Sequence, residues 1–196
     1  MALEIRTART ALVVIDLQRG IAAGPTAPHA AGDVIARVGL LAEAVRRGGG
    51  IVVLVRVMPS ADGRDALHPI ADAPRAAGTP PPDFAEIVPE LAPRPGDVVI
   101  TKRQWGAFYG TELDLQLRRR GIETILLAGI ATNVGVESTA RDAFERGYEQ
   151  VFVEDAMSAR DADEHRHTVE RIFPRIGRVR STAEVLAALA GADPAA

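Results

Sequence analysis

Short runs of β-branched and aliphatic residues alternate with amphipathic helical stretches along most of this chain. Six runs have the length and composition of strands, and most are apolar on both faces: residues 11–17, 51–57, 98–102, 124–129, 150–155 and 177–181. Strands that alternate with helices form parallel sheets covered by helices on both sides. The sequence therefore predicts an α/β fold with three layers, α/β/α, around a central, mostly parallel six-stranded sheet.

Five helices are expected between these strands, each marked by a start or stop signal. They are a helix over 33–47 capped by Asp33, one capped by Thr111, one over 133–146 with Asn133 as its cap, one over 162–173, and one that begins with a capping box of Ser181 and Glu184.

Residues 59–95 break this pattern, because they hold nine of the 13 prolines and show no periodicity. The chain is expected to form a single domain over 1–196, with 59–95 as a proline-rich insertion loop. A loop of this length is usually functional, so it is expected either to cover an active-site mouth or to reach a neighbouring subunit; a solvated insertion is the alternative.

Composition narrows the possible partners. The net charge is -3 and 47% of the residues are hydrophobic, which favours a small-molecule substrate over nucleic acid. The N-terminus lacks a basic-then-apolar leader and no apolar run is long enough to span a bilayer, so a cytoplasmic protein without a membrane partner is expected. The chain has no cysteine, which excludes disulfides, thiolate metal sites and a cysteine nucleophile.

Polar residues at the carboxyl ends of parallel strands are the first candidates for a site. Asp16 closes the apolar run ALVVI, Lys102 ends the run VVITK, and the run TILLAG leads into the glycine-rich turn of residues 129–135. Lys102 is the only lysine among 23 basic residues. Taken singly, the aspartate reads as a loop or capping residue, the lysine as a solvated strand end and the turn as a weak phosphate site.

Taken together, these residues resemble the isochorismatase-like hydrolases, the superfamily that includes nicotinamidases and N-carbamoylsarcosine amidases. The resemblance rests on ALVVIDLQRG, TKRQWGAFYGTELDLQLRRRGI, LLAGIATNVGVESTARDAFERGY and VEDAMSA, and it covers nearly the whole chain. It implies a Rossmann-like α/β fold.

Most members of that superfamily use an Asp, a Lys and a Cys. Here the resemblance places Asp16 and Lys102 at the first two positions, whereas the cysteine position, in ATNVGVESTARDA, is Gly135. Glycine has no nucleophile, so thiol chemistry cannot operate.

Isochorismatases share this glycine, and the resemblance implies their reaction, acid-catalysed hydrolysis of an enolpyruvyl (vinyl) ether with Asp16 as the acid. A free aspartate has a pKa near 3.9, which burial would raise and the Lys102 ammonium would lower. Lys102 then either orients the acid or binds a substrate carboxylate. A water-mediated amidohydrolase and a non-catalytic metabolite- or protein-binding member of the family are the alternatives.

The resemblance also implies a cis peptide between Ile130 and Ala131, with backbone N–H groups of Ala131 and Thr132 forming an oxyanion hole. From the residues themselves, four side chains are expected to bind substrate: Trp105, Phe108, Tyr109 and Arg56. Core packing and a surface position are the alternatives for the aromatic residues and the arginine.

No metal or other cofactor is expected. The four histidines, at 29, 68, 165 and 167, are scattered along the chain, and the pair at 165 and 167 points to different sides of a helix. Family members usually form homo-oligomers, so a dimer or tetramer is expected, with the proline-rich loop and the apolar C-terminal segment AEVLAALAGA in contact.

Overall fold

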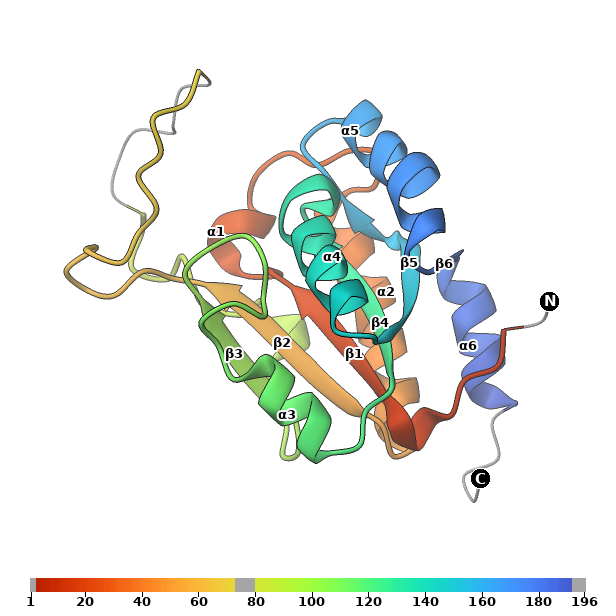
Figure 1. Ribbon diagram of the computed structural model, residues 1–196. Helices are drawn as coiled ribbons and strands as arrows, with labels where there is room; N and C mark the ends of the chain where they lie inside the picture. The colour runs from red at the N-terminus through yellow and green to blue at the C-terminus, as the bar shows by residue number, and fades with distance from the viewer. Residues whose placement is uncertain (1–2, 73–79, 192–196) are drawn as a thin grey trace.

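The computed structural model describes residues 3–72 and 80–191. These residues form a six-stranded sheet with helices packed around it (Figure 1). The strands are β1 (Thr10–Ile15), β2 (Ile51–Val57), β3 (Val98–Lys102), β4 (Thr124–Ile130), β5 (Glu149–Ser158) and β6 (Arg178–Arg180). Their order is β3-β2-β1-β4-β5-β6, and all the strand pairs in the sheet are parallel. The predicted α/β fold is confirmed.

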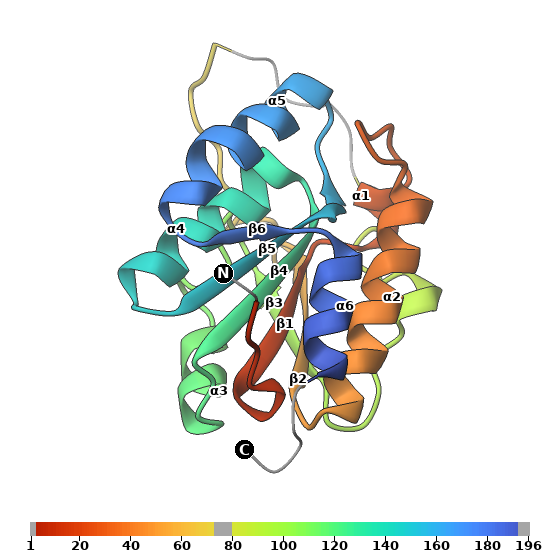
Figure 2. The same cartoon turned by 90° about the vertical axis from the view of Figure 1, so that its right-hand side faces the viewer.

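The helices are α1 (Arg19–Ala22), α2 (Ala31–Arg47), α3 (Leu113–Arg119), α4 (Glu137–Glu145), α5 (Ala162–His167) and α6 (Thr182–Ala190). A π-helical turn, Thr132–Val136, precedes α4, and a second, Thr168–Ile172, follows α5. Figure 2 shows α2 and α6 on one face of the sheet and α3, α4 and α5 on the other.

Strand β1 shows why the sheet needs a helical layer on each face, because it is buried from end to end. Successive side chains of a strand point to opposite faces. Leu12 and Val14 therefore pack with apolar residues of α2 and α6, whereas Val13 and Ile15 pack with those of α3 and α4. Each such side chain contributes about 1.5–3 kcal/mol when fully buried.

The helix signals of the sequence are met in part. Ser181 and Glu184 form the predicted capping box at the start of α6. The prediction for Asp33 is wrong, because α2 begins at Ala31 and Asp33 lies within its first turn. Asn133 lies inside the π-helical turn rather than at a cap, because that turn begins one residue earlier.

The chain crosses between the two halves of the sheet after β3, so that β1 and β4 are neighbours at its centre. Ligands of open parallel sheets bind outside the carboxyl ends of the strands at such a reversal of strand order. The fold therefore directs attention to the chain just after β1 and β4.

Residues 73–79 of the predicted proline-rich loop lie outside the described residues. Its described parts contain one short 3₁₀ turn, Pro89–Leu91. In the described chain, no helix combines the length and the hydropathy that crossing a bilayer requires.

Candidate active site

Asp16 and Lys102 form a buried ion pair at the carboxyl edge of the sheet. The Lys102 Nζ lies 2.8 Å from Oδ2 of Asp16 and also donates to the carbonyl oxygen of Trp105. Asp16 follows β1 with a φ of 52°, and its N–H donates to the carbonyl of Val55 on β2. Aspartate tolerates this left-handed conformation better than most residues. The strand end therefore fixes where the carboxyl group lies.

The environment of Asp16 favours the protonated carboxyl group more than water does. Burial raises its pKa to about 6, although the Lys102 charge and hydrogen bond oppose the rise. With that pKa, about one tenth of the carboxyl groups are protonated at pH 7. The second oxygen, Oδ1, is buried and has no hydrogen-bond partner within 3–72 and 80–191. The carboxyl group thus has a free oxygen that can hold a transferable proton.

Gly135 occupies the third corner of this site. A Cβ built on Gly135 would lie 3.0 Å from Nζ of Lys102 and 3.1 Å from Oδ2 of Asp16, and only 2.8 Å from Cγ2 of Ile15. The structure therefore brings together the three residues that the sequence pattern selected as a catalytic group. Gly135 has only a hydrogen atom at the position from which a side chain would contact both Asp16 and Lys102.

The turn after β4 lies next to this pair. Gly129 has a φ of 117°, and a Cβ there would lie 2.1 Å from the carbonyl oxygen of Ile15, so only glycine allows the ends of β1 and β4 to meet. The peptide between Ile130 and Ala131 is cis, the bond for which the resemblance implied that geometry.

A pocket of about 640 Å³ opens above these groups. That volume suits a small metabolite. Its lining residues come from strand ends and from the proline-rich segment: Asp16, Ile21, Val57, Pro59, Ala66, Leu67, Pro69, Pro80, Phe84, Lys102, Arg103, Gln104, Trp105, Ile130, Ala131, Val134, Gly135 and Arg160. The expectation that the segment 59–95 covers the mouth of a site agrees with this lining.

The charges of the pocket favour an anionic ligand. Within residues 3–72 and 80–191, the lining includes three cationic side chains, Lys102, Arg103 and Arg160, and one acidic side chain, Asp16. Arg103 pairs with Asp65 at 2.7 Å, and Arg160 donates to backbone carbonyls of the chain after β1. A planar guanidinium held in this way is suited to binding a carboxylate.

Of the four side chains expected to bind substrate, the structure places one in the pocket lining, Trp105. Phe108 is instead buried in the core, 5.9 Å from the ring of Tyr148, because the loop after β3 turns inward there. Tyr109 is exposed on the surface and does not line the pocket. Arg56 lies on β2 outside the lining, where its Nε donates to Thr101 Oγ1 at 3.1 Å.

The side chain of Thr132 also points away from the pocket. Its hydroxyl is buried and lies 2.9 Å from Nδ1 of His165. Burial lowers the pKa of this histidine to about 4. His29 joins the same region, whereas His167 is exposed on the other side of α5, as the helix spacing predicted.

Sequence reasoning did not single out several residues of the pocket lining, and two of these, Arg103 and Arg160, carry a signal. Arg160 follows the end of β5 and Arg103 follows β3, so both obey the strand-end rule. Phe84 lies in the irregular segment, where no periodicity identifies it. Gln18 holds it in place, because its Nε2 donates to the carbonyls of Phe84 and Val57.

This architecture is found in known proteins. Residues 10–184 match the Isochorismatase domain. The chain is 52% identical over 187 residues to the uncharacterized isochorismatase family protein YecD of Escherichia coli O157:H7, covering 95% of this chain and 100% of that protein. It is 34% identical to the ureidoacrylate amidohydrolase RutB of Stutzerimonas stutzeri over 79% of this chain and 71% of RutB.

The solved structures agree with these sequence matches. An isochorismatase family protein from Burkholderia thailandensis superimposes with a TM-score of 0.91 and 46% identity, covering 96% of this chain and 98% of that one. The domain match, the long sequence matches and the shared fold lead to one conclusion: the chain belongs to the isochorismatase family of hydrolases.

Proposed function

We propose that this protein hydrolyses the vinyl ether of a small anionic enolpyruvyl compound, with Asp16 as general acid and without a covalent intermediate. The observation that carries the proposal is the buried Asp16–Lys102 pair, in which the pKa of the carboxyl group is raised to about 6 and Gly135 provides no nucleophile. Such a site can donate a proton but cannot form a thioester.

The steps follow from the positions of these groups. Asp16 gives its proton to the terminal methylene carbon of the substrate, whose C=C electron pair forms the new C–H bond and leaves an oxocarbenium ion. Water adds to that cation and returns a proton to the Asp16 carboxylate. The resulting hemiketal breaks the C–O bond to its alcohol part. Its hydroxyl proton passes to the leaving alcohol oxygen, so pyruvate and an alcohol are released, one water is consumed and the acid is regenerated.

The remaining groups of the pocket are assigned to binding. Lys102 orients the acid, while Arg103 and Arg160 bind the substrate carboxylate. Backbone N–H groups of Ala131 and Thr132 stabilise the alcohol oxygen, which gains negative charge as the hemiketal C–O bond breaks. The apolar wall that includes Trp105 and Phe84 covers the rest of the substrate.

Pyruvate release provides the test. Wild-type protein and the Asp16→Asn variant are assayed with isochorismate and other enolpyruvyl ethers, with Asp33→Asn as a control on an exposed aspartate. We expect pyruvate from the wild type and the control, and a loss of about 10²–10⁴-fold in the Asp16 variant.

Two results would contradict the proposal. Ammonia release from a panel of small amides, without pyruvate, would assign the site to water-mediated amide hydrolysis, the kind of bond that the name of the relative RutB denotes. Quenching of the fluorescence of Trp105, the single tryptophan, by an anion that yields no product would instead identify a binding protein.

A further inference from the structure

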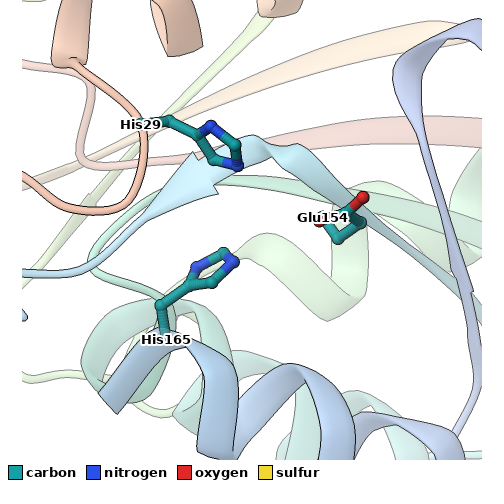
Figure 3. Close-up of side chains that lie close together, drawn as sticks. All are labelled: His29, Glu154 and His165. Atoms are coloured by element: carbon teal, nitrogen blue, oxygen red, sulfur yellow. The ribbon is translucent and has the colours of Figure 1, made fainter. Parts of the chain in front are cut away.

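Two histidines and a glutamate lie close together near the turn that follows β4, outside the pocket. His29, Glu154 and His165 each offer one ligand atom, and these atoms all lie within 4.8 Å of one another (Figure 3). They come from three separate parts of the fold: the loop before α2, strand β5 and helix α5. None of the three lines the pocket that contains Asp16.

The loop that carries His29 is fixed to the end of β5. The backbone N–H of His29 donates to Ser158 Oγ at 3.2 Å, and the same hydroxyl donates to the carbonyl of His29 at 2.8 Å. Ala27 and Ala159 add two backbone hydrogen bonds of 3.0 Å. The imidazole of His29 therefore extends from an anchored backbone.

An irregularity in β5 accounts for the position of Glu154. Leu127 of β4 pairs with Phe152 of β5, and the next pair is Gly129 with Met157. Between these two pairs β5 therefore has more residues than β4. The extra residues of β5 include Glu154. Irregularities of this kind redirect a side chain and are common beside functional sites.

His165 has the arrangement of a metal-binding histidine whose other ring nitrogen is held by a neighbouring oxygen. Its Nδ1 is engaged by Oγ1 of Thr132 at 2.9 Å, which leaves Nε2 for a ligand. Metal-bound histidines usually donate their other ring N–H to an oxygen in this way, which fixes the tautomer and the orientation of the ring.

Among the residues that the structure describes, the other two side chains are not engaged by hydrogen bonds or ion pairs. Across 3–72 and 80–191, neither the ring of His29 nor the carboxylate of Glu154 makes a hydrogen bond or an ion pair. The rings of His29 and His165 are nearly perpendicular, with their centroids 5.8 Å apart. By contrast the neighbouring Asp155 accepts from both the N–H and the hydroxyl of Thr182. Among the described residues Glu154 is thus half-buried and has no hydrogen-bond or salt-bridge partner.

We propose that His29, Glu154 and His165 bind a divalent transition-metal cation, with Zn²⁺ as the preferred ion. Two imidazoles and one carboxylate suit Zn²⁺ and disfavour Mg²⁺ and Ca²⁺, which prefer all-oxygen sites. Ligands of a tetrahedral zinc lie about 3.3 Å apart, as bond lengths near 2.0–2.1 Å require, so small side-chain rotations close the cluster around the ion. The fourth position is left to water.

The bound ion would join the His29 loop, β5 and α5 into one cross-linked unit. Because His165 also contacts Thr132, this unit supports the outer side of the turn whose Ala131 lines the pocket. The role is structural, since the ion does not reach the substrate.

Metal titration of the full chain, freed of any histidine tag and of metal by chelator treatment, tests the site. The probe is Co²⁺, followed by its visible absorption, with Zn²⁺ then added as competitor. We expect one equivalent to bind with the intense bands of a four-coordinate ion and to be displaced by Zn²⁺. His29→Gln and Glu154→Gln should each weaken binding by at least about tenfold.

His167→Gln is the matched control, because His167 lies on the same helix but is exposed. It should bind Co²⁺ like the wild type. Circular dichroism confirms the fold of each variant, and His29 and Glu154 lie on different elements, so either variant alone carries the test. Lack of saturable binding up to about 1 mM Co²⁺ would overturn the proposal, as would variants at both positions that bind as tightly as the wild type.

Discussion

At the scale of single residues, Asp16 is subject to two opposing influences. Burial favours its neutral form, while the ammonium of Lys102 at 2.8 Å favours the carboxylate, and the outcome is a pKa of about 6. General acids work best when their pKa lies near the operating pH. The pair thus combines a buried acid with a cation that keeps its proton transferable.

The pH dependence of the reaction follows from that pKa. In the proposed reaction Asp16 acts in its protonated form, so kcat/KM should be level below pH 6 and fall about tenfold for each pH unit above it. The measurement is kcat/KM from pH 5 to 8 with the enolpyruvyl ether that proves to be a substrate. A rate that rises with pH over this range would assign Asp16 the role of a base.

Lys102→Met separates tuning from binding. The variant keeps the apolar stem and removes the charge that lowers the pKa of Asp16. The pH at which kcat/KM begins to fall should therefore rise by about 1 unit or more. Arg103→Met removes another cation of the pocket, one that does not shift Asp16. It should raise KM, and kcat/KM should still begin to fall near pH 6. Identical profiles for both variants would show that Lys102 does not tune the acid.

Gly135→Ala tests the crowding at the third corner of the site. The added methyl would meet Ile15 at 2.8 Å and both charges at about 3 Å, so we expect a loss of about 1–3 kcal/mol in the free energy of unfolding and a smaller pocket. Gly39→Ala in α2 has open space around the same methyl group. The Gly39 variant should gain up to about 1 kcal/mol in the free energy of unfolding, because alanine favours a helix more than glycine does. Urea unfolding should therefore show the two variants shifted in opposite directions. Equal effects would contradict the crowding.

At the scale of the elements, Gln18 connects the sheet to the proline-rich segment. Its amide oxygen accepts from the N–H of Val57, and its Nε2 donates to the carbonyls of Val57 and Phe84. A Cβ on Gly20 would lie 1.9 Å from the ring of Phe84, so that glycine also allows the segment to approach. The wall of the pocket depends on these two contacts.

Gln18→Leu should therefore affect both stability and substrate binding. Buried groups that lose their partners cost about 1–3 kcal/mol, and release of Phe84 should raise KM more than it lowers kcat. Urea unfolding and steady-state kinetics measure the two effects. Gln116→Leu on α3 is the control, and equal losses in both variants would refute a specific role for Gln18.

Element positions could be predicted where periodicity and strand ends govern them. β2 and β3 match their predicted ranges, and Asp16, Lys102 and Gly135 meet because parallel strands end at one edge. Irregular segments carry no such rule, which is why Phe108 was expected in the pocket and lies in the core. His29 and His165 are 136 positions apart, and only the folded loop brings them together.

At the scale of the whole molecule, several large apolar side chains are exposed, and two of them, Trp105 and Leu67, line the pocket. Trp105 and Tyr109 are 63% and 77% exposed, and Leu67 and Ile70 of the proline-rich segment are exposed as well. Apolar patches of this kind mark interaction sites. In contrast α6, which contains most of the apolar C-terminal segment, buries Val185 and Leu189 in the core, as an ordinary core helix does.

We expect the exposed patch to join copies of the chain, as a dimer or tetramer. Light scattering after size exclusion should give at least twice the chain mass of 20.8 kDa. A double variant, Leu67→Ser with Ile70→Ser, should shift the protein toward monomer, whereas Leu40→Ser on α2 should not. A wild type that elutes at the chain mass would contradict this assembly.

The glycine beside the buried ion pair also determines how the protein responds to oxidants. A cysteine at position 135 would lie beside the Lys102 ammonium, and a thiol in such surroundings loses its proton readily and is oxidised to sulfenic and then sulfinic acid. Here the reacting centre has a hydrogen in that place and the chain has no sulfhydryl group at all. Peroxide and thiol-alkylating agents that inactivate cysteine hydrolases find no thiol in this chain, so we expect the proposed activity to survive treatment with either.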